Sequence, residues 1–380
     1  MFWLREDLYF TGNHSMSDSS AFSAVRFTRD TDFIKTLRSR VKTYFEANGI
    51  SHYGNTEMYL KTFFMLLLFY LPYSMIVTQV ITSNIGILIM YAIMGLGMAG
   101  IGLSIMHDAN HGAYSQKKWV NQLMGLCLNL MGGNAAMWRI QHNILHHSFT
   151  NIEGMDEDID PPAFLLRFSP HRKRNFLHRF QHYYAWVLYG LMSLSWVILK
   201  DFQQFFRYKK MGLNKTQGSE TKVFWSLLFW KMVYWTYIII IPIWVLNIQW
   251  HIVLLGFLTL QFITGLILAA IFQPAHVIPE STFPLPNEER TIENNFAVHQ
   301  LSTTANFASQ SRWFSWFVGG LNYQVEHHLF PNICHVHYRS LSPIVEQTAR
   351  EYGLPYHQLG SFANALKVHT QMLKKLGRED

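Results

Sequence analysis

The chain has 380 residues, of which 49% are hydrophobic, 16% aromatic and only 14% charged. About a quarter of the residues of an average soluble domain are charged, so this composition argues against a soluble fold and predicts an all-α polytopic membrane protein. The net charge of +7 accompanies no nucleic-acid-binding motif. We attribute it to surfaces that face anionic lipid or acidic ligands. The two cysteines exclude a disulfide scaffold and a protein-held iron–sulfur cluster.

The N-terminal region divides into two parts. Residues 1–20 have neither the basic start nor the apolar run of a signal peptide, and we expect a disordered stretch or an expression tag, with Met16 as an alternative native start. Residues 21–58 are basic and carry apolar side chains at helical spacing, such as Phe33, Leu37 and Val41. This pattern predicts a cytoplasmic amphipathic helix before the membrane.

Residues 59–380 are expected to form the membrane domain. Four apolar stretches are long enough to cross a bilayer: residues 59–82, 85–106, 224–247 and 250–272. They form two hairpins whose short links, ITSN and NIQW, contain no Lys or Arg, whereas all the other loops carry the basic residues. The positive-inside rule therefore places both termini and the long central loop in the cytoplasm. Two shorter stretches, 121–137 and 183–199, are expected to be interfacial or re-entrant helices.

Three histidine clusters lie on the predicted cytoplasmic side. They read HDANH, HNILHH and QVEHH, and their histidines are His107, His111, His142, His146, His147, His327 and His328. Buried ring nitrogens need a hydrogen-bond partner or a metal, so a shared metal centre is the leading hypothesis. Seven histidines exceed what one ion can use and therefore predict two ions. His276, just past the last span, is expected to be an eighth ligand, and Gln324, Asp156 and Asp158 are candidate ligands or supports of the imidazoles.

Histidine ligands alone do not choose among iron, zinc, copper and nickel. A zinc hydrolase is disfavoured because the chain has no HExxH motif. A transporter would place ionisable groups inside its spans, whereas here they cluster at the span ends. Each cluster taken singly is also compatible with packing histidines or a pH-sensitive patch. Oxidation of a lipid C–H bond by iron and dioxygen suits an all-nitrogen site at the membrane surface best.

The flanking sequences extend these clusters to MHDANHGAYS and NYQVEHHLFP. Together with HNILHH and two hairpins, they resemble the membrane fatty-acid desaturases, and the Gln of the third cluster resembles the front-end subgroup. The resemblance implies a helical cytoplasmic cap with a di-iron site, fed by dioxygen and two electrons, that leaves a cis double bond in an acyl chain. It implies as ligands His107, His111, His142, His146, His147, His276, His327 and His328. Gln324 then replaces a histidine that other desaturases use.

Many front-end desaturases contain a fused cytochrome domain marked by His-Pro-Gly-Gly, and this sequence lacks that motif. The resemblance then implies that this chain binds no haem. A separate donor, either ferredoxin or a b-type cytochrome with its reductase, would supply the electrons to a basic cytoplasmic face.

The substrate is expected to be acyl-CoA or an acyl-lipid, with a double bond introduced at a position such as delta-6 or delta-5. A membrane di-iron hydroxylase or monooxygenase would share every ligand and stays an alternative. Arg167, Arg172, Lys173 and Arg174 are candidates for binding the substrate headgroup. A dry, bent tunnel is expected to be lined by Trp138, Trp186, Trp196, Phe272, Trp313 and Trp316.

Overall fold

The computed structural model describes residues 25–28, 32–162 and 164–379, and most of them are helical. The expected N-terminal segment 1–20 lies outside the described residues. Five helices are long and apolar enough to cross a membrane: Thr56–Val77, Asn84–Asn110, Leu177–Lys210, Glu220–Val245 and Trp250–His276. The chain is therefore a polytopic helical membrane protein, as its composition predicts.

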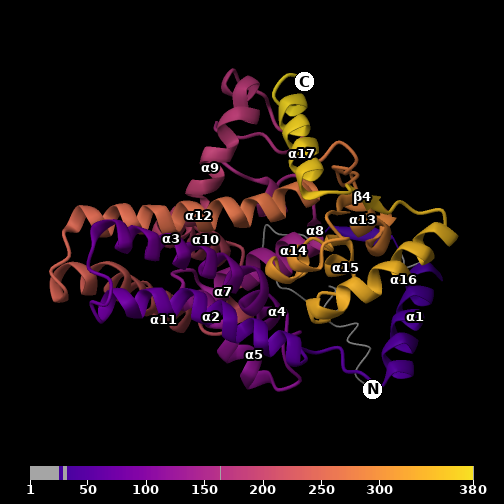
Figure 1. Ribbon diagram of the computed structural model, residues 1–380. Helices are drawn as coiled ribbons and strands as arrows, with labels where there is room; N and C mark the ends of the chain where they lie inside the picture. Colours follow the sequence, from indigo (N-terminus) through magenta and orange to yellow (C-terminus); the bar gives the residue numbers. More distant parts are fainter. Residues whose placement is uncertain (1–24, 29–31, 163, 380) are drawn as a thin grey trace.

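Four of these helices form the two expected hairpins, which run side by side in Figure 1. The first contains α2 (Thr56–Val77) and α3 (Asn84–Gly100), and α3 continues through the π-helical turn η2 (Ile101–Ile105) into α4 (Met106–Asn110). The second contains α11 (Glu220–Trp235), its π-helical extension η8 (Thr236–Val245) and α12 (Trp250–His276). A Cβ on Gly97 would lie 2.7 Å from a backbone nitrogen of α2, and one on Gly95 would lie 2.9 Å from a carbonyl of α12. Small residues thus let α3 pack closely between its two neighbours.

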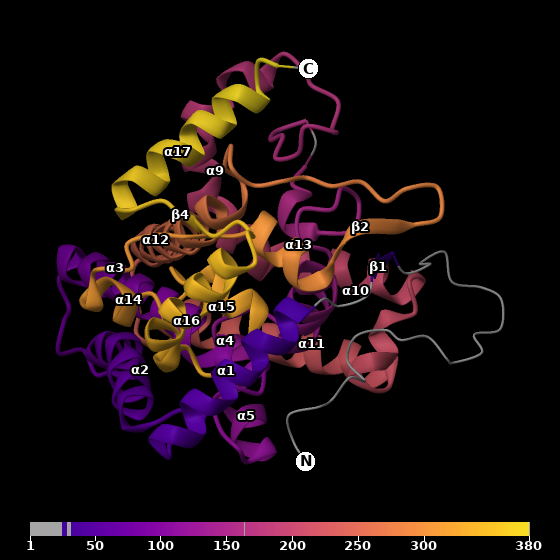
Figure 2. The ribbon, with the colours of Figure 1, turned by 90° about the vertical axis from the view of Figure 1, so that its right-hand side faces the viewer.

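The stretch 183–199 belongs to a longer helix than expected. Within Leu177–Lys210, α9 (Gln181–Ser195) continues through η6 (Trp196–Lys200) into α10 (Asp201–Lys210). The charge of Asp201 does not end the helix because its carboxylate is buried 2.6 Å from the Lys231 ammonium of α11. In Figures 1 and 2, α9 runs across α12 and not alongside it.

The stretch 121–137 is divided among α5 (Lys118–Gly125), α6 (Cys127–Leu130) and α7 (Ala135–Trp138), where one interfacial or re-entrant helix was expected. The chain turns at Gly132, whose φ is +84° and whose added Cβ would lie 2.7 Å from the ring of Tyr234. Glycine is required there by both conformation and space. The segment leads into η3 (Arg139–His146) and α8 (His147–Phe149).

The cap lies at one end of the hairpins (Figure 1). It consists of α1 (Asp32–Asn48), α13 (Phe296–Thr303), α14 (Arg312–Phe317), α15 (Gln324–Leu329), α16 (Tyr338–Glu351) and α17 (Phe362–Leu376). Two short parallel pairs join distant segments: β1 (Arg26–Thr28) with β2 (Thr291–Asn295), and β3 (Ala305–Asn306) with β4 (His357–Gln358). Single 3₁₀ turns occur at Glu157–Ile159, Leu177–Phe180, Leu213–Gln217 and His335–His337.

The helix α1 buries the apolar face seen in the sequence. Phe33, Leu37, Val41 and Phe45 are buried in one cluster with residues of α15 and α16. The first helix thereby covers the cap close to the third histidine cluster.

We expect Leu37→Ala to lower the free energy of unfolding by about 2–5 kcal/mol, because the side chain is fully buried and its loss leaves a cavity. Thermal unfolding of the purified protein in detergent would show a lower midpoint. Arg38→Ala, at an exposed position of the same helix, is the matched control. Equal midpoints for the two variants would show that α1 does not pack as described.

Candidate metal centre

Four separate segments bring the predicted histidines together. His107 and His111 lie at the end of the long first-hairpin helix, and His276 is the last residue of α12. His142, His146 and His147 lie on η3 and the start of α8, and His327 and His328 lie on α15. Seven of these eight side chains are buried, and His111 is partly exposed. Segments up to about 220 residues apart in the sequence therefore meet in one place, as the metal hypothesis requires.

The imidazoles form overlapping groups in which the potential ligand atoms lie within 4.8 Å of one another. These groups are His107, His111, His142 and His327; His146, His276 and His328; and His147, His327 and His328. The Nε2 atom of His147 is 2.9 Å from that of His327 and 3.2 Å from that of His142. Ring nitrogens that converge in this way suit cations held between them.

The outward nitrogens of several rings are held by the protein. Nδ1 of His328 lies 2.8 Å from the side-chain oxygen of Gln300, and Nδ1 of His276 lies 3.2 Å from the carbonyl of Thr303. Nδ1 of His327 lies 3.2 Å from the hydroxyl of Tyr338. A proton on each Nδ1 leaves the Nε2 lone pair directed at the centre, which is the tautomer that a metal ligand needs.

The inward nitrogens fit a metal. Nε2 of His111, His276 and His328 is buried and has no hydrogen-bond partner among the described residues. Burial and the neighbouring rings lower the pKa of His142, His147, His327 and His328 well below the usual value. Neutral rings with unpaired inward lone pairs are competent ligands at neutral pH.

Asp156 and Asp158 both contact His146. Its Nδ1 is 3.1 Å from each oxygen of the buried Asp156 carboxylate and 3.3 Å from Oδ2 of Asp158. Burial alone would lower the pKa of His146, but the two carboxylates raise it to about 9. Asp156 is itself fixed by the backbone N–H groups of Asn151 and Asp158. Asp156 therefore lies where it can orient this imidazole, whereas Asp158 also lines the cavity described below and lies within ligand distance of both His142 and His146.

A buried chain of polar groups supports the first cluster. Asp108 Oδ2 accepts hydrogen bonds from Nδ1 of His335 at 2.8 Å and from its backbone N–H at 3.0 Å, and Oδ1 lies 3.6 Å from Nδ1 of His107. The Lys61 ammonium on α2 is 2.6 Å from Nε2 of His335. Asp108, Cys334 and His335 could also be taken for metal ligands. The Lys61 ammonium already supplies a cation next to them.

Gln324 is the first residue of α15 and lies beside the His276 ring. The nitrogen and oxygen of its side-chain amide are buried and form no hydrogen bond of normal geometry with the described residues. Glu326, on the same short helix, accepts hydrogen bonds from Asn306 and Tyr356. These bonds fix the helix that presents His327 and His328. Gln324 thus stays a candidate ligand next to the second group of imidazoles.

The predicted headgroup residues have different surroundings. Arg167 is buried and donates to the backbone carbonyls of Pro170, Arg172, Leu376 and Glu379. Arg172 pairs with Glu153 and Asp160. Lys173 and Arg174 are exposed. Arg167 and Arg172 therefore hold the C-terminus and the acidic loop in place.

An apolar cavity of about 100 Å³ reaches the centre between α3, α9 and α12. His107 and His142 line it together with Trp138, Trp196 and Phe272, as expected from the sequence. Trp186, Trp313 and Trp316 do not line it, and Trp313 is 85% exposed. The cavity connects apolar space between the helices to the imidazoles.

The fold and the site define a polytopic helical membrane protein with buried histidine clusters that could hold metal beside an apolar cavity. The family model "Fatty acid desaturase" matches residues 83–360. The acyl-lipid (8-3)-desaturase of Physcomitrium patens is 36% identical over 91% of this chain and 72% of its own length. The sn-1 linoleoyl-lipid 6-desaturases of Arthrospira platensis and Synechocystis sp. are 35% and 32% identical, over 94% and 93% of this chain and 96% and 98% of their own lengths.

The chain belongs to the fatty acid desaturase family, so the resemblance read from the histidine clusters is confirmed. It is an oxidoreductase that desaturates fatty acyl chains.

The sequence did not predict which residues hold the imidazoles and their neighbours in place, namely Gln300, Thr303, Tyr338 and Lys61. Gln300, Thr303 and Tyr338 follow no spacing rule relative to the histidines they hold. Lys61 stands alone in an apolar stretch, where a lysine usually extends to the interface. The one sequence signal is the histidine that precedes Gln300, His299.

We expect His146→Ala to abolish product formation and lower the bound metal, because the ring belongs to the second group of imidazoles and is held by two carboxylates. Asp156→Asn keeps the ring but weakens its orientation, and should lower metal affinity or activity by about 10–100-fold. Elemental analysis of the purified protein and a product assay measure both effects.

His251→Ala is the matched control because this ring is exposed at the start of α12, far along the helix from His276. Full metal content and activity in His146→Ala would remove this cluster from the site.

Proposed function

We propose that the protein is an oxygen-dependent front-end desaturase that introduces a cis double bond into the acyl chain of a membrane lipid. The observation that best supports this proposal is that eight imidazoles converge at the end of an apolar cavity. The names of the relatives from Physcomitrium patens and Arthrospira platensis support an acyl-lipid substrate and a position such as delta-6 or delta-5. Acyl-CoA stays the alternative carrier.

We propose that two iron ions bind here. The first would be held by His107, His111, His142 and His327, the second by His146, His276 and His328, with His147 between them. Bound iron supplies the oxidising power that an unactivated methylene C–H bond requires. Overall, two adjacent methylenes lose two hydrogens, and dioxygen takes up these hydrogens together with two electrons and two protons and leaves as two waters. The electrons come from a separate ferredoxin, or from a b-type cytochrome with its reductase.

The chain's own residues position the substrate and exclude water. Trp138 and Phe272 border the cavity next to His107 and His142, so the reacting carbons lie among apolar side chains. Holding two adjacent carbons at the same place supplies proximity and orientation. The outward hydrogen bonds of His276, His327 and His328 keep the ring positions fixed between turnovers.

A hydroxylase would use the same ligands, and only its product would differ. No residue described above favours insertion of oxygen over removal of a second hydrogen. The relatives named as desaturases therefore support the desaturase reaction over the hydroxylase.

In the membrane, we propose four crossings, with both termini and the metal centre on the cytoplasmic side. The crosswise course of α9 relative to α12 supports a helix in the membrane plane, although Leu177–Lys210 is long enough to cross (Figure 1). The loops 78–83 and 247–249 contain no Lys or Arg and lie at the end of the hairpins away from the cap. The positive-inside rule then places these loops outside.

Expression in a host that makes linoleate but no further polyunsaturated lipid should yield a new fatty acid with an additional cis double bond between the carboxyl end and the existing bonds. Gas chromatography with mass spectrometry of the total lipids measures it. Isolated membranes should require both dioxygen and an added electron donor. Turnover without oxygen, or a hydroxylated product, would contradict the desaturase reaction proposed here.

Single cysteines test the membrane arrangement. Thr82→Cys, in an exposed link, should be labelled by an impermeant maleimide from outside the cell, and Lys215→Cys, in the exposed turn after α10, only after permeabilisation. The native Cys127 and Cys334 are buried and provide the unlabelled background. The reverse pattern would invert the proposed topology.

A further inference from the structure

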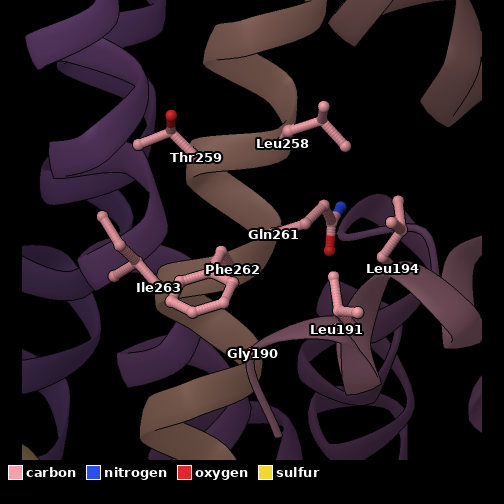
Figure 3. Close-up of a pocket in the computed structure, with 8 residues that line it drawn as sticks. All are labelled: Gly190, Leu191, Leu194, Leu258, Thr259, Gln261, Phe262 and Ile263. Carbon is pink, nitrogen blue, oxygen red and sulfur yellow. The ribbon is translucent and has the colours of Figure 1, made fainter. Parts of the chain in front are cut away.

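A groove of about 340 Å³ lies between α9 and α12, separate from the cavity that reaches the histidines (Figure 3). Its lining residues are Gly190, Leu191, Leu194, Leu258, Thr259, Gln261, Phe262 and Ile263. The Thr259 hydroxyl donates to the backbone of Leu255, and the Gln261 amide group donates to the hydroxyl of Tyr234. The rest of the surface is aliphatic or aromatic, which suits hydrocarbon.

The groove exists because two helices touch at glycines and then separate. A Cβ on Gly265 would lie 2.7 Å from the carbonyl of Tyr189, and a Cβ on Gly190 would lie 2.2 Å from the ring of Phe262. The backbones of α9 and α12 are therefore almost in contact at this point. Since α9 runs across α12 (Figures 1 and 2), the two helices diverge beyond the contact and leave a gap between Leu191 and Leu258.

Only a thin wall separates this groove from the catalytic cavity. Leu194 and Ile263 line the groove, whereas their neighbours in sequence, Ser193 and Thr264, line the cavity. The Ser193 hydroxyl donates to the backbone carbonyl of Gln261 at 2.6 Å, which closes the wall. Two apolar spaces thus lie on opposite sides of one helix contact.

The groove opens on a face that suits lipid. Tyr183, Val187 and Leu191 follow one another at four-residue spacing on α9 and are 71%, 56% and 42% exposed. Leu258 and Phe262 on α12 are also exposed. In a membrane protein such a continuous apolar face contacts acyl chains, so the groove is directly accessible from the bilayer.

We propose that this groove holds the second, non-reacting acyl chain of a diacyl lipid whose other chain occupies the catalytic cavity. The inference rests on the proposed acyl-lipid substrate. Two chains that leave one glycerol must both be accommodated when one is withdrawn from the bilayer, and an apolar groove next to the cavity lets the other remain among hydrocarbon. A single-chain substrate has no use for the groove.

Leu191→Trp would fill the groove from α9, and Val187→Trp places the same side chain one turn earlier on the same exposed face, outside the groove. The purified enzyme, supplied with its electron donor, is assayed on a diacyl lipid and on the lysolipid with the same headgroup and the same reacting chain. We expect Leu191→Trp to lower kcat/KM for the diacyl lipid by about tenfold or more and to leave the lysolipid almost unchanged. Val187→Trp should change neither.

Equal losses of kcat/KM on both substrates would overturn the proposal, because they would indicate that the groove is a passage for the reacting chain. No loss on either substrate would also overturn it, because the groove would then hold ordinary bilayer lipid. If the wild-type enzyme acts on acyl-CoA but on no diacyl lipid, the acyl-lipid substrate itself is refuted before any variant is compared.

Photolabelling tests the binding directly and does not depend on turnover. A diacyl lipid with a diazirine in its non-reacting chain should label peptides that contain Leu191 or Leu258. Excess unlabelled diacyl lipid should suppress the labelling, and so should excess lysolipid, because it competes for the catalytic cavity that holds the other chain of the probe. Labelling confined to other exposed helices would contradict the assignment.

Discussion

The structure depends on the cost of burying imidazole nitrogens in an apolar protein. A ring nitrogen without a partner is as unfavourable as any other unpaired buried polar atom. Here the protein satisfies the outward nitrogens of His146, His276, His327 and His328 with carboxylate, carbonyl, hydroxyl and amide oxygens. The inward Nε2 atoms of His276 and His328 have no hydrogen-bond partner among the described residues. A metal ion held between the rings would satisfy these nitrogens, and its binding would then be coupled to folding of the cap.

Backbone geometry explains how one cluster directs three histidines toward the candidate metal centre. A regular α-helix would place His142 and His146 on one face but would turn His147 well away from them. The segment Arg139–His146 is instead π-helical, with hydrogen bonds between residues five apart. The rings of His142 and His146 stack at 5.3 Å, and Nε2 of His147 still lies 3.2 Å from that of His142. A second π-helical turn, Ile101–Ile105, directly precedes α4, the short helix that contains His107. Local departures from the α-helix thus aim neighbouring side chains at one point.

The sequence reveals the candidate ligands but not most of the residues that support them. His107, His142 and His327 could be selected as candidate ligands because each belongs to a short cluster of histidines, and three such clusters occur in one apolar chain. Gln300 could not be identified, because an amide 28 residues before His328 follows no local pattern. The length of the helix containing α9 was misjudged for a related reason. In the sequence, Asp201 marks the end of an apolar stretch. Only the structure shows that its charge is paired with Lys231 of another helix, so that the helix continues past it.

The buried Lys61 shows how the hairpins and the metal centre depend on each other. An ammonium in a membrane helix is costly unless it is paired, and removing one member of a buried pair costs more than the pair contributes. Lys61 is 1% exposed and is joined through His335 to Asp108, which lies between the two histidines of the first cluster. A shift of α2 relative to α3 would separate these groups and leave the charge unpaired. The chain of contacts therefore ties the packing of the first hairpin to the position of His107, so the same interactions that hold the membrane helices together also fix one side of the site.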